Sequence, residues 1–140
     1  MSGLTRALLL NAGVTSADVP KVLASKLLDR EVGHLLMRPE VGEQLVLGYD
    51  ANVPLVVDAG QVLALDGTRR PVNATVAAFV DVLGRYAEYV LNVVDAAGAE
   101  EGTRLARQAV AEMRRIDPAA FETADSYWSI VCEQMLAGNL

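Results

Sequence analysis

Four short apolar and β-branched runs, closely spaced along the chain, constrain the fold more than any other feature of the sequence. Each run is followed by a few turn-forming residues, among them Asp, Asn, Gly and Pro, which favour tight reversals. Strands joined by connections this short pair as antiparallel neighbours. The pattern therefore predicts an antiparallel β-meander of three to five strands. The runs are VGHLLMR (32–38), EQLVLGY (43–49), VPLVVD (53–58) and QVLALD (61–66).

Helical periodicity dominates the chain on both sides of these runs. Apolar residues recur at three- and four-residue steps in 5–12 and 15–30, and again in three stretches after residue 73. Helices that flank an antiparallel sheet are typical of an α+β domain with the helices packed on one face. A chain of 140 residues is long enough to bury its own core, so we expect one domain spanning 1–140.

The triplet Asn73-Ala74-Thr75 has two readings. It is a glycosylation acceptor in a secreted chain, but the first residues lack the long apolar run and cleavage site of a signal peptide. The sequence thus favours a cytoplasmic protein. Asn73 also precedes a long apolar stripe, which predicts that it caps a helix over about 74–94. The stripe comprises Val76, Phe79, Val80, Leu83, Tyr86, Ala87, Val90, Leu91 and Val94.

Residues that could carry chemistry are few. His34 is the only histidine and Cys132 the only cysteine, whereas a zinc site needs several such ligands. Cys132 lies beside the stripe of a last helix that contains Trp128, which favours a buried position for both side chains. No phosphate-binding or dinucleotide motif is present. We therefore predict no catalytic residue, no cofactor and no metal.

An acidic stretch from Pro39 to Thr68 contains five carboxylates and no Lys or Arg. Asp residues are common at turns because they hydrogen-bond their own backbone, so turn chemistry alone could explain it. Alternate turns of a meander lie at the same edge, however, so Asp50 and Asp66 should gather there and attract a basic partner. The candidate partner-binding residues are Tyr49, Asp50, Asn52, Asp58 and Asp66.

The charge balance narrows the choice of partner. The net charge is −6, which disfavours nucleic acid as a ligand and suits a basic protein. The longest apolar stretch, 76–94, contains Asp81, Arg85 and Glu88, which excludes a membrane span. We expect a monomer or a weak homodimer.

The segment EQLVLGYDANVPLVVDAGQVLALDGTRRPVNATVAAFVDVLGRY resembles the central block of the SUKH superfamily, especially its fourth subgroup of bacterial immunity proteins. The ending RRIDPAAFETADSYWSIVCEQMLAG is similar to that subgroup's Asp-Pro segment and Trp-bearing final helix. The resemblance covers about 100 residues and rests on order and spacing. Thr15 departs from the family's usual Pro. It implies a SUKH fold and a non-enzymatic protein that neutralises a cognate toxin, often a nuclease or deaminase.

Two other classes of function share these properties. A small acidic secretion chaperone would hold an unfolded client on an exposed apolar surface. A structural or regulatory interaction module would use the fold without any toxin. An enzyme is the third choice, since no nucleophile or metal set can be assembled from the sequence.

Overall fold

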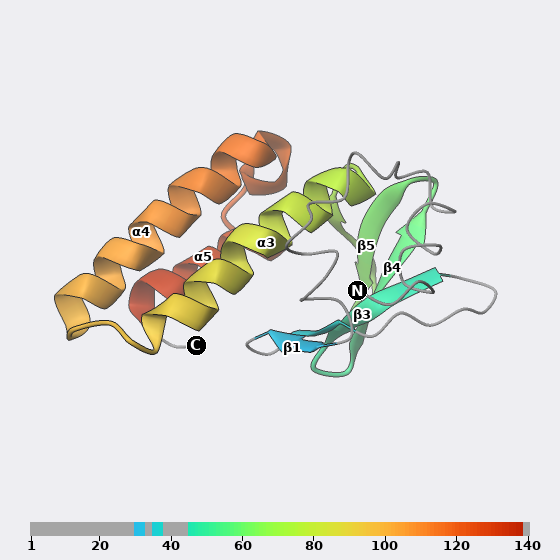
Figure 1. The fold of residues 1–140 in the computed structure, drawn as a ribbon. Coiled ribbons are helices and arrows are strands. Elements are labelled where there is room, and N and C mark those ends of the chain that lie inside the picture. Colours follow the sequence, from blue (N-terminus) through green and yellow to red (C-terminus); the bar gives the residue numbers. More distant parts are fainter. Residues whose placement is uncertain (1–29, 33–34, 38–44, 139–140) are drawn as a thin grey trace.

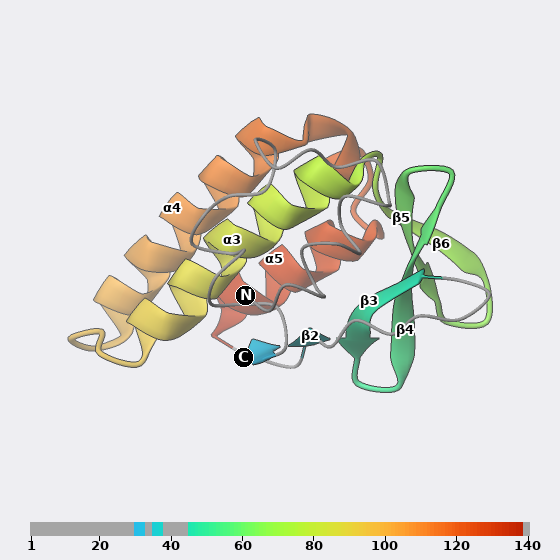
Figure 2. The same ribbon diagram turned by 45° about the vertical axis from the view of Figure 1, so that its right-hand side comes forward.

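The computed structural model describes residues 30–32, 35–37 and 45–138. Within them an antiparallel sheet is followed by helices that gather on one side of it, which confirms the predicted α+β arrangement (Figures 1 and 2). The helix predicted at 5–12, the helix predicted at 15–30 except its last residue, and His34 lie outside the described residues. That last residue, Arg30, begins the strand β1.

The described strands form a six-stranded meander in which every strand pairs with its neighbours in sequence. The predicted run 32–38 contains parts of two short strands, with Val32 opposite Leu35. The last strand was not predicted, because its sequence RRPVN has two arginines and a proline. It lies at the edge of the sheet, where a proline is tolerated. The strands are β1 (Arg30–Val32), β2 (Leu35–Met37), β3 (Leu45–Asp50), β4 (Val53–Asp58), β5 (Gln61–Leu65) and β6 (Arg69–Asn73).

Gly48 explains how β3 can approach β2. The ladder between β3 and β4 shifts register between Val46 and Gly48, as at a β-bulge. A Cβ atom at position 48 would collide with the main-chain oxygen of Leu36. Glycine is therefore required for the two backbones to lie this close.

The helical layer begins with an antiparallel pair, α3 (Val76–Val93) and α4 (Ala99–Ile116). A 3₁₀ turn, η1 (Pro118–Phe121), then leads to α5 (Tyr127–Ala137). Both ribbon views place the α3–α4 loop at the end of the molecule away from the sheet (Figures 1 and 2). The start of α3 and the start of α5 lie at the other end, where both helices contact β6.

The prediction that Asn73 caps α3 is wrong. The N-cap is Thr75, whose Oγ1 accepts a hydrogen bond from the main-chain nitrogen of Ala78 at 3.0 Å. Asn73 is the last residue of β6, and its side chain is buried. The error follows from the missed strand, because the helix cannot begin until the chain has left the sheet.

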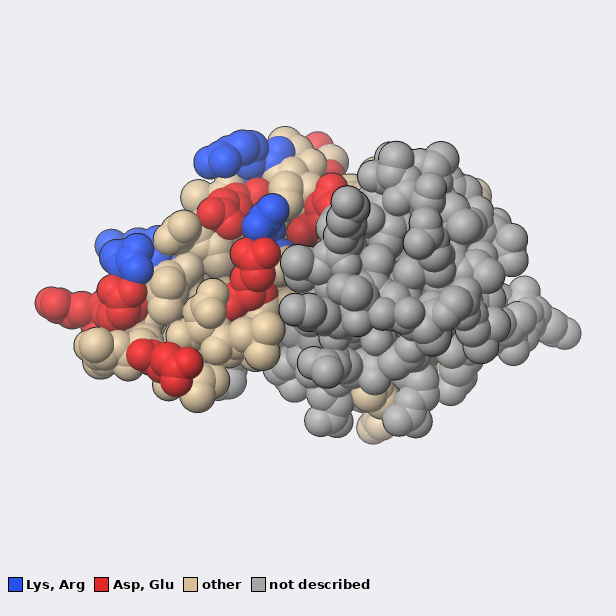
Figure 3. Space-filling view, viewed as in Figure 1, with Lys and Arg blue, Asp and Glu red and all other residues tan. Residues whose placement is uncertain are grey.

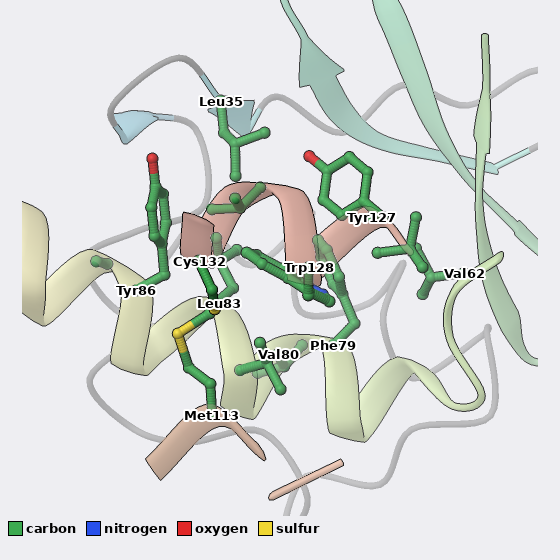
Figure 4. Packing of buried hydrophobic residues seen from close by; sticks show 14 of the residues in the cluster. Leu35, Val62, Phe79, Val80, Leu83, Tyr86, Met113, Tyr127, Trp128 and Cys132 are labelled. Carbon is green, nitrogen blue, oxygen red and sulfur yellow. The ribbon is translucent and has the colours of Figure 1, made fainter. Parts of the chain in front are cut away.

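Trp128 stands at the centre of the hydrophobic core and is fully buried, as predicted. The rings of Phe79, Tyr86 and Tyr127 surround it, with centroids 6.4, 5.9 and 5.3 Å away (Figure 4). The nearest ring, Tyr127, meets it edge-on, a favourable geometry for an aromatic pair. The core therefore joins α3 and α5 through aromatic contacts.

The apolar stripe of α3 is not buried along its whole length. Leu91 and Val94 were predicted to belong to the buried face, but they are 65% and 81% exposed. Val82 and Tyr89 are buried although they were not assigned to the stripe. The buried residues of α3 lie between Val76 and Tyr89, and the two exposed members of the stripe come after them.

Candidate partner-binding site

The turns of the sheet carry the five predicted site residues. Tyr49 and Asp50 end β3, and Asn52 lies in the turn before β4. Asp66 lies in the β5–β6 turn, which the meander places at the same end of the sheet. Asp58 lies at the opposite end, beside the β4–β5 turn. The strand order therefore brings Tyr49, Asp50, Asn52 and Asp66 to one end and leaves Asp58 at the other.

Arginines from β6 accompany two of these carboxylates. Arg69 forms an ion pair with Asp58 across the sheet. Arg70 Nη1 lies 3.5 Å from a carboxylate oxygen of Asp66. The stretch without Lys or Arg ends one residue before these arginines, so for Asp58 and Asp66 the expectation of an uncompensated charge is wrong.

Asp66 is further engaged by its own turn. Thr68 Oγ1 donates a hydrogen bond to Asp66 Oδ1 at 3.0 Å. This hydrogen bond is the largest influence that lowers the pKa of Asp66, and the charge of Arg70 acts in the same direction. The carboxylate therefore stabilises the β5–β6 turn, as expected of an Asp in this position.

Asp50 is directed toward the aromatic core. Burial raises the pKa of Tyr127 far above its ordinary value, and the negative charge of Asp50 raises it further. Burial likewise raises the pKa of Tyr86 to about 12, again with a contribution from Asp50. The negative charge of Asp50 therefore raises the pKa of two tyrosines of the core, in addition to any effect that it has on a partner in solvent.

A cleft of about 680 Å³ lies between β6 and the segment that joins η1 to α5. Arg70 donates a hydrogen bond to the main-chain oxygen of Asp125 and so links the two walls. The wall residues are mainly polar or small: Gln61, Asp66, Thr68, Arg70, Pro71, Val72, Asn73, Ala74, Ala119, Ala120, Glu122, Thr123, Asp125 and Ser126.

A buried polar cluster lies beside this cleft and holds three segments together. Asn73 Nδ2 donates to Asp117 Oδ2 at 2.7 Å, and Trp128 Nε1 donates to Asn73 Oδ1 at 2.8 Å. The three residues come from β6, the residue before η1 and α5, and each is at most 7% exposed. We call Asn73, Asp117 and Trp128 the polar latch. The sequence offered one signal for it, since a buried indole N–H usually requires an acceptor.

The described residues include one candidate nucleophile, Cys132. Burial raises the pKa of its thiol to about 11, although the charge of Arg114 acts against this. The group is therefore a thiol near neutral pH, and the thiolate is the reactive form. The described residues contain no group of three or more His, Cys, Asp or Glu side chains that could hold a metal ion. None of the helices described here is both long and apolar enough to cross a membrane.

Comparison with known proteins gives one match. Residues 16–134 match the family model described as SUKH-4 immunity protein. Neither the curated proteins nor the solved structures gave a match to this chain. The matched region contains the sheet, the latch and nearly all of α5. Because the match spans most of its 140 residues, the chain belongs to the SUKH-4 immunity protein family.

Proposed function

We propose that this protein binds a cognate bacterial toxin that acts on nucleic acid, such as a nuclease or a deaminase, and neutralises it by occupying its surface. The observation that carries the proposal is the family match over residues 16–134, since an immunity protein family implies a toxin-neutralising role. Neutralisation by binding requires a shaped and charged surface and no reactive group on the immunity protein. The proposed site of action is the cytoplasm.

The negative net charge of this protein favours a toxin that acts on nucleic acid. Proteins that act on nucleic acid present cationic clefts to the phosphate backbone. A partner with net charge −6 is attracted to such a cleft, and the attraction raises the association rate at low ionic strength. The same charge disfavours direct competition for nucleic acid by the immunity protein itself.

The sheet-turn residues Tyr49, Asp50, Asn52, Asp58 and Asp66 remain proposed toxin contacts. Asp58 and Asp66 already have arginine partners, so a toxin arginine would have to compete for them. Asn52 is exposed at its turn and can offer an amide to a partner. We therefore propose that the turns of the sheet contribute directional hydrogen bonds more than long-range attraction.

A test uses the toxin domain encoded in the neighbouring reading frame, expressed with and without this protein. We expect co-expression to restore growth, and the two proteins to purify as a complex with one folded toxin domain. A secretion chaperone would instead act as an obligate dimer and bind an extended segment of its client. A regulatory module would leave toxicity unchanged, and that outcome would contradict the proposal.

A further inference from the structure

The loop end of the α3–α4 pair exposes apolar side chains to an unusual degree. Among the described residues three large hydrophobic side chains are exposed. Two of them are three positions apart: Leu91 in the last turn of α3 and Val94 at its C-cap. Residues at this spacing lie next to each other on a helix surface. A single exposed leucine is ordinary, whereas an adjacent pair rimmed by charge is typical of an interaction site.

Two exposed carboxylates, Asp95 and Glu100, flank the loop that follows this apolar pair. Asp95 and Glu100 are exposed, and neither side chain forms an ion pair or a hydrogen bond with a described residue. Their neighbours behave differently, because Glu88 pairs with Arg85 at 3.1 Å and Glu101 pairs with Arg104. We call Leu91, Val94, Asp95 and Glu100 the hairpin tip. The tip thus combines apolar area with two carboxylates that form no ion pair with a described residue, although Arg104 and Arg107 line the same hollow as Glu100.

The hairpin tip is held in place by two helices, α3 and α4, which pack against each other. Figures 1 and 2 show the α3–α4 loop at the end of the molecule farthest from the sheet. Figure 3 shows acidic side chains beside uncharged surface at this end, with a basic group next to them. Gly98 has a φ of 95°, which lets the chain reverse between the two helices. A loop supported by two packed helices loses little conformational entropy when it binds.

We infer that the hairpin tip is a second docking surface for the toxin, in addition to the sheet turns, which deepens the function proposed above and rests on it. The fitting surface is an apolar pocket that receives Leu91 and Val94, flanked by Arg or Lys side chains that meet Asp95 and Glu100. Arg and Lys side chains of this kind are expected on the surface of a protein that acts on nucleic acid.

Charge favours the toxin over the other occupants. A two-fold contact between copies of this chain would place the same patch against itself and bring Asp95 and Glu100 toward like charges. An anionic membrane surface would repel the same two carboxylates. A partner with cationic residues around an apolar pocket satisfies both parts of the tip.

The test compares association of the neighbouring-frame toxin domain with matched variants of this protein. The double variant Leu91→Ser/Val94→Ser should raise the Kd for the toxin domain about tenfold or more, because the substitutions remove the apolar side chains that contact the toxin. Asp95→Asn/Glu100→Gln should slow association several-fold at low salt and little at high salt. Leu136→Ser is the control, since Leu136 is also exposed, at 43%, but lies on α5. Circular dichroism establishes that each variant is folded.

The outcomes separate two failures. If the wild-type protein does not bind the toxin domain, the proposed function fails. If the wild type binds and the tip variants bind equally well, the docking surface is elsewhere and only this inference is overturned. Sedimentation of the toxin-free protein supplies a further check, because a dimer that dissociates in Leu91→Ser/Val94→Ser would assign the tip to contact between copies.

Discussion

The two ends of the helical layer have opposite properties. At the end near β6, the polar latch satisfies a buried amide, a buried carboxylate and an indole N–H with one another. At the other end, the hairpin tip leaves apolar side chains and carboxylates in solvent without described partners. A buried polar group destabilises the folded state unless it forms a hydrogen bond. The hydrogen bonds of the polar latch therefore contribute to the stability of the fold at this end. The second end contributes little to folding and is available for binding.

The largest expected effect is at the latch end. Trp128→Ala removes a fully buried ring that contacts three other aromatic residues, so the free energy of unfolding should fall by about 3–5 kcal/mol. A loss of this size can unfold a domain of ordinary stability. Urea unfolding followed by circular dichroism measures it, with Trp128→Phe as the milder control. Near-wild-type stability of Trp128→Ala would contradict the assignment of this end to folding.

The next largest loss of stability is expected at Asn73, and it distinguishes a residue of the polar latch from a helix cap. Asn73→Ala leaves the Asp117 carboxylate and the Trp128 indole N–H without their partner, which should cost about 1–3 kcal/mol. Asn73→Ser should be about as harmful, because a serine is too short to bridge both groups. If serine restored stability in chemical denaturation, Asn73 would be acting as a cap.

A smaller loss is expected at Thr75, two residues away. Thr75→Ala removes the side-chain acceptor for the Ala78 nitrogen and should cost on the order of 1 kcal/mol. Thr75→Ser keeps the hydroxyl and should be close to wild type in the same denaturation experiment. The pattern at position 75 should therefore differ from that at position 73, where serine does not rescue.

The smallest effect on folding is expected at the hairpin tip. Leu91→Ser/Val94→Ser replaces side chains that are already mostly in water, so the free energy of unfolding should change by less than about 0.5 kcal/mol. Thermal unfolding of this variant beside Asn73→Ala measures the contrast directly. A large fall in the free energy of unfolding of the tip variant would show that the hairpin tip contributes to folding as the polar latch does, which contradicts the contrast between the two ends.

The turns of the sheet teach a related lesson about charge. The stretch from Pro39 to Thr68 has no basic residue, yet the partners of Asp58 and Asp66 are Arg69 and Arg70, which follow immediately. The strand β6 returns these arginines alongside β5, and one side chain reaches across to Asp58. Counting charges along a segment cannot reveal this, because antiparallel pairing brings the next segment back beside it.

The sequence by itself determined the order of the elements, the meander and the family. Turn residues and alternating runs are local signals, and a turn of two residues leaves the chain no other pairing. Helical periodicity was equally local, so the helix predicted over about 74–94 is close to the observed α3, and the last helix contains Trp128 as predicted.

Only the tertiary structure decided which side chains meet and which remain in water. Asn73 binds partners that are 44 and 55 residues away, and no local pattern encodes such a distance. Leu91 and Val94 share the periodicity of the buried stripe, but their side chains are mostly exposed to solvent. Periodicity fixes the face on which a residue lies. Burial depends on whether another element reaches that face, which is settled only when the whole chain has packed.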